Sequence, residues 1–273
     1  MTIITLSSDF GADGYFVGVM HGVIASLAPI ARIIDLCHTI RPYGRLQAAR
    51  LISANYHYFP AGSIHVIVVD PGVGSERNVI LLEADGHYFL APDNGILSQI
   101  AAKPKSRVWV IDRPELYLKP LSQTFHGRDI FAPLAAHLAL GETPKNMASQ
   151  VNLEDLIRLD APQPQLDYES QQISGAVIDI DHFGNIITNI SRQLVRTFFA
   201  DTADTADTAM IIDINGQQLQ GIASYYNEKA VGLAVALYNS EDLLEIAINQ
   251  GRACDFLQVK SDTRIIIRAE VSS

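Results

Sequence analysis

Short apolar runs alternate with helical segments along the first 160 residues, and this alternation limits the possible folds more than any other feature of the chain. The runs are β-branched and almost continuously apolar, as buried strands are: Ile3 to Leu6, Arg32 to Leu36, Ile64 to Val69, Val79 to Glu83, Tyr88 to Leu90 and Val108 to Ile111. Helical periodicity, ended each time by Pro or Gly, occupies Tyr15 to Leu27, Arg45 to Tyr58 and Asp129 to Leu140. The alternation predicts an α/β domain with a mostly parallel sheet wrapped by helices.

The pattern changes at Asp160 to Gln165, a stretch with two prolines and no apolar periodicity, which is typical of a linker. Beyond it, strand-like runs follow one another with almost no helix between them: Ala176 to Ile180, Ile186 to Ile190, Met210 to Ile214, Leu233 to Leu237, Leu244 to Ile248 and Arg264 to Arg268. We predict an α/β domain over 1–160, a linker over 161–169 and a small all-β barrel or sandwich over 170–273. The Ala-Asp-Thr repeat of Ala200 to Ala209 is expected to form an exposed loop without a chemical role.

Composition excludes several classes of protein. The chain has 273 residues, 48% of them hydrophobic, yet no apolar run approaches the roughly 20 residues of a membrane span. Its start lacks the basic region of a signal peptide, so we expect a soluble, cytoplasmic protein. Cys37 and Cys254 lie far apart without metal-ligand spacing and are expected to be reduced thiols. A net charge of −10 disfavours nucleic acid, which leaves a small-molecule partner.

Two polar clusters carry the chemistry. Asp70 to Gly74 ends the strongest strand signal, and Arg77 follows within the same loop. The cluster around His126 opens a helical segment, where the helix dipole lowers the basicity of an imidazole. Parallel α/β folds bind ligands at the ends of such elements, so an acid, a guanidinium and an imidazole are expected to meet there. The alternatives are an ordinary turn at Asp70 and a structural histidine at His126.

Three further motifs offer groups that bind a ligand. Asp9 follows the first strand, where its carboxylate suits two neighbouring sugar hydroxyls, although a turn or helix-cap role is as plausible. In the second domain, Asp181 to Asn185 and Tyr238 to Glu241 each combine an aromatic ring with amide, hydroxyl or carboxylate groups. Such a combination suits a ligand with a flat base and an amino acid head, but taken alone the two stretches favour ordinary polar hairpin turns.

These motifs, in this order, resemble the S-adenosylmethionine hydroxide adenosyltransferases, relatives of the S-adenosylmethionine-dependent fluorinase and chlorinase. The matching blocks run nearly from end to end: Ser8 to Gly11, Pro92 to Gly95, Phe125 to Asp129, Phe183 to Asn185, Thr188 to Asn189, Asn239 to Ser240 and Leu244 to Ala247. The resemblance implies an N-terminal α/β domain, a C-terminal β-barrel and a homotrimer. In such trimers the ligand lies between the first domain of one subunit and the barrel of its neighbour.

The resemblance also implies residue roles. Asp70, Arg77 and His126 match the set that marks the water-using branch of the family, and Asp9 matches the carboxylate that holds the ribose. Positions around the methionine head, the adenosine and its aromatic walls are matched by Asp181, Asn185, Ser240, Tyr43, Phe125 and Phe183.

The chain departs from the family pattern at three positions. Gly44 stands where an acidic residue often follows the Pro-aromatic pair, and Glu241 replaces an arginine that binds the substrate carboxylate in the fluorinase. Gly127 stands where the fluorinase has a serine that contacts its halide. The change at Gly44 is expected to affect the pocket wall. The change at Glu241 is expected to affect recognition of the methionine carboxylate, and that at Gly127 halide binding.

The expected reaction is hydrolysis of S-adenosylmethionine to adenosine and methionine, without a cofactor or a metal ion. The sulfonium leaves without needing a proton, so catalysis concerns the water that attacks ribose C5′. A nucleoside hydrolase is disfavoured because Val73 to Glu76 lacks the aspartates of a calcium loop. Two alternatives remain: a metal-dependent phosphatase using Asp9, Asp13, Asp93 and His126, and a non-catalytic sensor of S-adenosylmethionine or a nucleoside.

Overall fold

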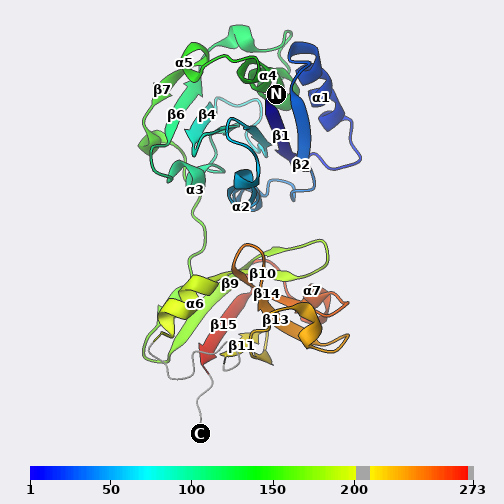
Figure 1. The fold of residues 1–273 in the computed structure, drawn as a ribbon, viewed down its shortest axis with the longest axis vertical. Coiled ribbons are helices and arrows are strands. Elements are labelled where there is room, and N and C mark those ends of the chain that lie inside the picture. Colours follow the sequence, from blue (N-terminus) through cyan, green and yellow to red (C-terminus); the bar gives the residue numbers. More distant parts are fainter. Residues whose placement is uncertain (201–209, 270–273) are drawn as a thin grey trace. The chain divides into compact units, whose positions relative to one another are not determined.

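The computed structural model describes residues 1–200 and 210–269 and divides the chain into two units, Met1–Asp160 and Ala161–Ser273 (Figure 1). Apart from Ala200, the Ala-Asp-Thr repeat lies outside the described residues. The strands of unit 1 are β1 (Ile3–Ser8), β2 (Arg32–Cys37), β3 (Ile64–Val68), β4 (Val79–Ala84), β5 (His87–Pro92), β6 (Arg107–Ile111) and β7 (Ala148–Val151). They form one seven-stranded sheet in the order β2-β1-β3-β5-β4-β6-β7. All six strands expected from the sequence are present.

The sheet is mixed, so the expectation of a mostly parallel sheet is not confirmed. The pairs β1–β2, β1–β3 and β3–β5 are parallel, whereas β4–β5, β4–β6 and β6–β7 are antiparallel. The direction changes at Asp85-Gly86, a two-residue turn in which both residues have positive φ. Asp-Gly pairs form such hairpin turns readily, and a hairpin makes neighbouring strands antiparallel. The turn residues between two expected strands were the sequence signal for this change.

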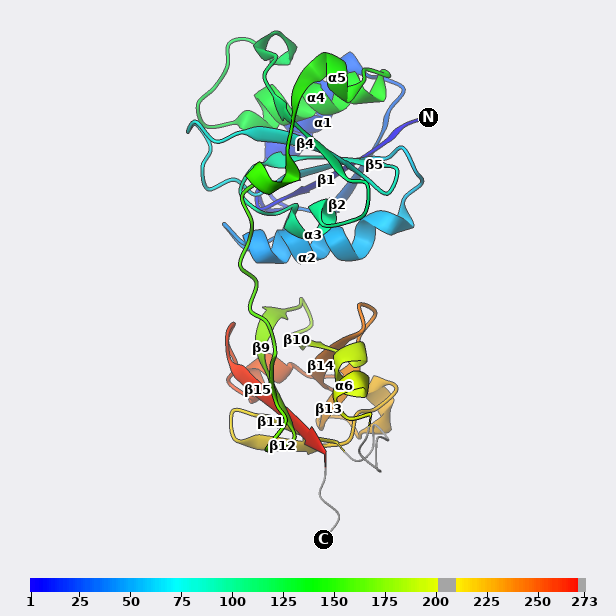
Figure 2. The ribbon, with the colours of Figure 1, turned by 90° about the vertical axis from the view of Figure 1, so that its left-hand side faces the viewer.

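Helices cover both faces of this sheet (Figure 2). The helical segments of unit 1 are α1 (Phe16–Leu27), α2 (Arg45–Asn55), η1 (Tyr56–Tyr58), α3 (Ser98–Ala101), η2 (Pro114–Leu116), η3 (Gly127–Phe131), α4 (Ala132–Ala139), α5 (Pro144–Met147) and η4 (Leu153–Asp155). Side chains of α1 and α4 share one buried cluster with alternate residues of β1 and β3, and side chains of α2 and α3 share the other. Strands buried on both faces explain the continuous apolar runs in the sequence.

Unit 2 is an antiparallel, nearly closed, barrel-like sheet. Its elements are β8 (Gln165–Asp167), β9 (Gln172–Ile180), β10 (Ile186–Ser191), α6 (Arg192–Phe198), β11 (Met210–Ile214), β12 (Gln217–Gln220), η6 (Tyr226–Glu228), β13 (Ala234–Tyr238), β14 (Leu243–Ile248), α7 (Ala253–Phe256) and β15 (Arg264–Ala269). The strand order is β12-β11-β15-β9-β10-β14-β13, with β8 beside β9. Part of the segment expected to be a linker, 161–169, is therefore a strand.

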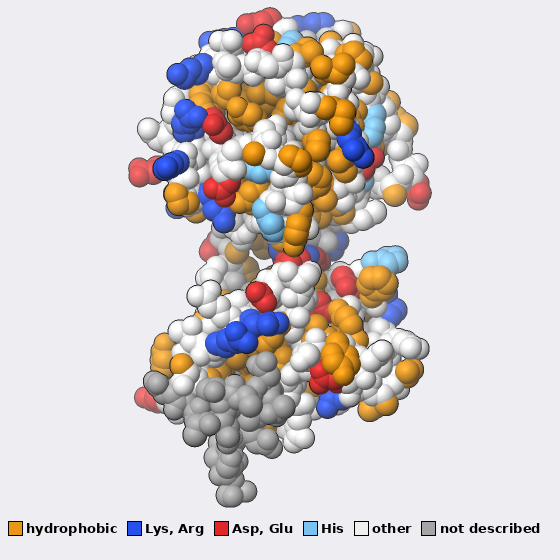
Figure 3. Space-filling model, viewed as in Figure 1, with side chains coloured by type: hydrophobic (Ala, Val, Ile, Leu, Met, Phe, Trp, Pro, Cys, Tyr) orange, Lys and Arg blue, Asp and Glu red, His pale blue; other side chains and the backbone are white. Residues whose placement is uncertain are grey.

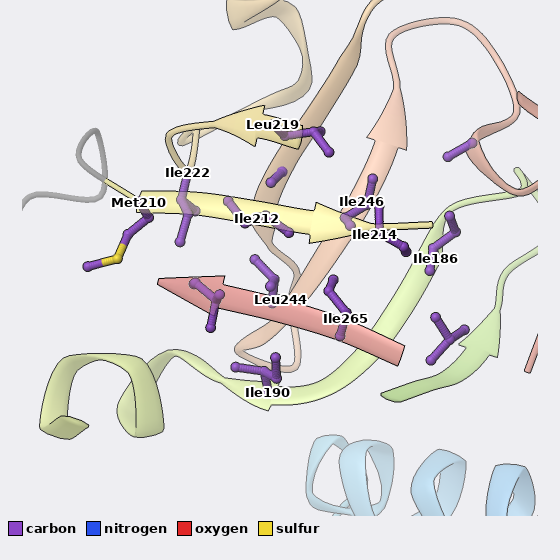
Figure 4. Close-up of a cluster of buried hydrophobic side chains, with 14 of the residues drawn as sticks. Ile186, Ile190, Met210, Ile212, Ile214, Leu219, Ile222, Leu244, Ile246 and Ile265 are labelled. Atoms are coloured by element: carbon purple, nitrogen blue, oxygen red, sulfur yellow. The ribbon is translucent and has the colours of Figure 1, made fainter. Parts of the chain in front are cut away.

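Isoleucines dominate the core of unit 2 (Figure 4). Alternate residues of β11, namely Met210, Ile212 and Ile214, are buried there together with Ile265 and Ile267 of β15. Alternation is what a strand with one buried face requires, because successive side chains point to opposite faces. The β-branched composition of these runs therefore builds the interior of unit 2, while the opposite faces of β11 and β15 mix charged residues with half-buried isoleucines.

The surface is mixed in character (Figure 3). On the drawn face, Lys and Arg side chains are dispersed among acidic and hydrophobic ones. Over residues 1–200 and 210–269, none of the helices has the length and apolarity needed to span a bilayer.

Candidate functional site

Two neighbouring strands of unit 1 end beside each other and deliver the first polar groups of the candidate site. β1 and β3 are parallel, with Ser8 opposite Val68. Asp9 therefore follows β1 at the same sheet edge where Asp70 follows β3. This edge carries the carboxyl ends of the parallel strands, where α/β folds bind ligands.

Asp70, Arg77 and His126 form one hydrogen-bonded row. Nε of Arg77 donates to both carboxylate oxygens of Asp70, at 3.1 and 2.9 Å, and Nη2 of Arg77 also donates to Oδ2. The same Nη2 lies 2.8 Å from Nδ1 of His126. The side chains of Asp70 and Arg77 are almost fully buried. The structure thus brings together the three residues that the sequence singled out as catalytic candidates.

The loop after β3 is held against the loop before His126 by a close backbone approach. Gly74 has φ +80°, and a Cβ at this position would lie 2.4 Å from the carbonyl oxygen of Gln123. Only glycine fits both the conformation and the contact. At the start of the loop, the amide of Gly72 donates to Oδ1 of Asp70 at 3.2 Å. These contacts explain how Arg77 reaches His126 from a loop 49 residues earlier.

His126 precedes the π-helical turn η3 and is 6% exposed. Burial, and then the charge of Arg77, hold the pKa of His126 below its ordinary value, although Asp70 and Asp129 oppose this. A guanidinium only donates hydrogen bonds, so Nδ1 of His126 is the acceptor and the neutral ring carries its proton on Nε2. Nε2 is buried and has no hydrogen-bond partner within the described residues. The row therefore ends in one N–H donor.

Asp9 and Tyr43 lie together, and Phe125 packs among other aromatic rings. The amide of Tyr43 donates to Oδ2 of Asp9 at 2.9 Å, and the Tyr43 ring is exposed. Phe125, expected to be an aromatic wall, is only 8% exposed and packs edge-on against Phe10 and Phe16 in the core. Its ring thereby fixes the backbone next to His126.

The departure at Gly44 has a structural reason. A Cβ at Gly44 would lie 2.8 Å from the carbonyl oxygen of Arg41, so a larger side chain would force the backbone to move. The next residue, Arg45, donates to the carbonyl oxygen of Asn94 at 3.2 Å. The segment that carries Tyr43 is therefore shaped by its own backbone packing.

Unit 2 contains a pocket of about 550 Å³ beside the motif that the sequence indicated. Asp181 accepts from the backbone amide of Asn185 at 2.8 Å and from its side-chain amide at 3.0 Å. Phe183 and Asn185 line the pocket, and the Phe183 ring is 71% exposed. Ser240 lies in the turn between β13 and β14 and is not a lining residue of this pocket.

Sequence reasoning missed a buried acid next to this pocket. Tyr226, another lining residue, donates to Oε1 of Glu245 at 2.8 Å. Burial raises the pKa of Glu245, against the hydrogen bond from Tyr226, and burial together with Glu245 raises the pKa of Tyr226 to about 12. A charged residue inside the apolar run of β14 was the signal for Glu245. Tyr226 had no signal, because it follows an irregular segment.

Asp93, a residue of the metal-dependent alternative, makes a contact within unit 1. Among the described residues, no three His, Cys, Asp or Glu side chains are grouped closely enough to hold a metal ion. Asp93 accepts a hydrogen bond from the amide of Ile157 at 3.0 Å, and burial raises its pKa. That carboxylate ties two segments of unit 1 together.

The fold defines a two-domain protein, with a mixed α/β sheet in unit 1 and a nearly closed, barrel-like sheet in unit 2. Family models of the SAM hydroxide adenosyltransferase N-terminal and C-terminal domains match residues 4–148 and 175–266. The chain belongs to the SAM hydroxide adenosyltransferase family, which confirms the resemblance seen in its motifs.

Named relatives agree with this assignment. Proteins called (R)-S-adenosyl-L-methionine hydrolase from Salinispora arenicola and Methanocaldococcus jannaschii are 32% and 35% identical, and the alignments cover 97% and 95% of this chain and 97% and 93% of theirs. A protein called fluorinase from Nocardia brasiliensis is 26% identical over 90% of both chains. A crystal structure of an uncharacterized conserved protein from Thermotoga maritima is similar, with TM-score 0.87, 31% identity and 97% and 99% coverage.

Proposed function

We propose that this chain hydrolyses S-adenosyl-L-methionine to adenosine and L-methionine, with water attacking ribose C5′ in line with the departing sulfonium. The observation that carries the proposal is the row Asp70–Arg77–His126, because it combines a fixed cation with a buried N–H donor. Membership of the family and the names of the relatives support the choice of substrate.

The row suits stabilisation of hydroxide. We propose that the Nε2–H of His126 donates to the attacking oxygen, and that Arg77 keeps Nδ1 engaged so that this donor persists. His126 cannot take a proton at Nε2 while Nε2 already carries one, and both oxygens of Asp70 accept from Arg77. The water proton therefore leaves to solvent, and the row lowers the energy of the remaining hydroxide. Donors fixed in advance around a developing charge commonly contribute the largest share of catalysis.

Substrate contacts are proposed for both units. In unit 1, the carboxylate of Asp9 accepts hydrogen bonds from the ribose hydroxyls. The amide of Tyr43 donates to Oδ2 of Asp9 and so fixes the direction in which the carboxylate points. The exposed ring of Tyr43 serves as a wall, and Phe125 supports the site from the core. In unit 2, Phe183 and Asn185 hold the adenosine in the pocket, with Asp181 and Ser240 near the methionine head.

The product distinguishes this reaction from its alternatives. Incubation with S-adenosylmethionine in halide-free, ¹⁸O-enriched water is expected to yield adenosine labelled at the 5′-oxygen, together with unlabelled methionine. Chromatography with mass spectrometry measures both. Release of free adenine would indicate a nucleoside hydrolase, and unchanged ligand at high enzyme concentration would indicate a sensor.

We further propose a homotrimer in which unit 1 of one subunit and unit 2 of a neighbour share each substrate. Subunit mixing tests this arrangement. Copies with His126→Ala and copies with Asn185→Ala are each expected to be nearly inactive, while their mixture regains activity because some sites receive two unaltered halves. Light scattering gives the mass of the assembly. A mixture that stays inactive would place both halves in a single chain.

A further inference from the structure

A second hydrogen-bonded row ends at Ser8, the residue before Asp9, and has no part in the proposed chemistry. Oγ of Ser8 lies 2.7 Å from Nδ1 of His38, and Nε2 of His38 lies 3.0 Å from Oδ1 of Asp35. The same Oδ1 is 2.7 Å from Nε2 of His21. Asp35 and Ser8 come from β2 and β1, which are paired in the sheet. The row thus runs from the surface to the residue that precedes Asp9.

This Ser-His-Asp order resembles a nucleophilic triad, but Ser8 cannot act as a nucleophile. Ser8 is 1% exposed, and its Oγ already accepts a hydrogen bond from the amide of Phe10 at 3.3 Å. The contacts with His38 and Phe10 hold this oxygen within the chain. The row must therefore act on the chain around it.

Each hydrogen bond in the row has a defined direction. Although burial acts to raise it, hydrogen bonds from His21 and His38 hold the pKa of Asp35 below its ordinary value, so Asp35 is an ionised acceptor. His38 consequently donates from Nε2, and in the neutral tautomer with this proton its Nδ1 accepts from the hydroxyl of Ser8. The Ser8 oxygen in turn accepts from the amide of Phe10.

The row grips the turn on both sides of Asp9. Ser8 and Phe10 are the two neighbours of Asp9, and the amide of Phe10 donates to Oγ of Ser8. The amide of Gly11 donates to the carbonyl oxygen of His38 at 2.8 Å. The segment that contains His38 continues to Tyr43, whose amide binds the Asp9 carboxylate. One segment therefore fixes both the backbone and the carboxylate of Asp9.

We propose that His38 is a positioning residue, which orients the Asp9 carboxylate toward the ribose through its hydrogen bond with Ser8. The inference rests on the proposed function. Asp70, Arg77 and His126 lie on other loops, so loss of His38 weakens ligand binding and leaves the chemical step unchanged. Loss of one such hydrogen bond is expected to raise the dissociation constant of adenosine about 5-fold.

Two conservative variants separate the two contacts of His38. In His38→Asn the side-chain oxygen takes the place of Nδ1 and accepts from Ser8, whereas in His38→Gln the side-chain amide takes the place of Nε2 and donates to Asp35. We expect His38→Ala and His38→Gln to bind adenosine about 5-fold more weakly, and His38→Asn to recover to within about 2-fold of the wild type. Calorimetry measures the dissociation constants, and single-turnover rates at saturating S-adenosylmethionine should be equal. Recovery by Gln in place of Asn would overturn the proposal.

A double-mutant cycle and a control complete the test. In an Asp9→Ala background, His38→Ala is expected to have no further effect, because His38 acts through Asp9. His21→Ala removes a partner of the same Asp35 oxygen without touching the turn and should bind as the wild type does. Additive effects in the cycle, or a fall in the saturating rate of His38→Ala with unchanged binding, would contradict the inference. A wild-type chain that neither binds adenosine nor cleaves S-adenosylmethionine would instead contradict the proposed function.

Discussion

Nη2 of Arg77 lies 2.8 Å from Nδ1 of His126, while the same guanidinium is held by the carboxylate of Asp70. A guanidinium gripped at two of its nitrogens cannot rotate away from the imidazole. The contact therefore sets the tautomer of His126 and places the proton on the buried Nε2. In this arrangement Asp70 orients the imidazole through Arg77.

Removing either end of this contact should slow the chemical step. His126→Ala deletes the donor, and Arg77→Ala releases the imidazole, so each is expected to lower the single-turnover rate by about 10² or more. The dissociation constant of S-adenosylmethionine should change little, because both groups act on the attacking water. Arg77→Lys should also be impaired, since one ammonium cannot hold Asp70 and His126 in the same geometry.

Arg113→Ala is the matched control for these variants. Arg113 forms an exposed ion pair with Asp112, 2.7 Å apart, on the surface of unit 1. Its loss should leave rate and binding unchanged. Normal turnover by His126→Ala and Arg77→Ala would refute the catalytic assignment.

Asp9→Ala is expected to behave in the opposite way. It removes hydrogen bonds to the ribose that exist before and during the reaction, so the dissociation constant should rise about 10- to 100-fold. The rate at saturation should fall much less. Calorimetry with adenosine measures the first quantity, and Asp13→Ala, an exposed neighbouring carboxylate, is the control. An intact affinity would place the ribose elsewhere.

Water should be preferred over halides even in concentrated chloride or fluoride. A halide must lose its hydration shell, which requires several donors or a net positive charge. The charges of Asp70 and Arg77 neutralise each other, and both oxygens of the acid accept from the guanidinium. Chromatography in each salt should show adenosine as the main product. Accumulation of 5′-chloro- or 5′-fluoro-5′-deoxyadenosine would overturn the preference for water.

A serine at Gly127, the residue type of the fluorinase, should destabilise unit 1. A Cβ at Gly127 would lie 3.1 Å from Sδ of Met20 and 3.1 Å from Cε2 of Phe10. Gly127→Ser is therefore expected to destabilise unit 1 by about 1–3 kcal/mol, in the range of other overpacked cores. Thermal unfolding measures this loss of stability. A variant as stable as the wild type would show that the side chains of Phe10 and Met20 move aside without lowering the stability.

Stability should fall as the pH is lowered below 6.5, because of a buried histidine. Nδ1 of His65 lies 2.8 Å from Oγ1 of Thr5, and Nε2 lies 3.1 Å from Nδ1 of His87. Burial, and then the neighbouring His87, lower the pKa of His65 from 6.5 to about 3. Between these values the unfolded chain binds a proton at His65 that the folded chain does not, so stability decreases as the pH falls.

Denaturant unfolding at pH values from 7 to 5 measures this effect. His65 should contribute a slope of up to about 1.4 kcal/mol per pH unit, which His65→Gln removes. His57→Gln changes an exposed histidine and is expected to keep the wild-type slope. An unchanged slope in His65→Gln would assign the pH dependence to other groups.

Local patterns were sufficient for most elements of the fold. The apolar runs located six strands of unit 1 because strands buried on both faces leave a continuous signal in the sequence. The antiparallel direction of β4 relative to β5 was not predicted, although the Asp85-Gly86 pair is typical of a hairpin turn. Strands β7, β8 and β12 were also missed. All three are very short, and β8 and β12 carry mostly polar residues.

The sequence by itself determined which chemical groups the site has, since Asp9, Asp70, Arg77 and His126 stand next to the ends of readable elements. Only the tertiary structure decided how these groups are connected. The orientation of His126 depends on a contact across 49 residues, and the row from Ser8 through His38 to Asp35 joins two neighbouring strands. The same is true of Phe125, whose burial against Phe10 and Phe16 follows from packing. Periodicity reports the face of an element that is buried, whereas partners across the fold depend on how strands and loops meet in space.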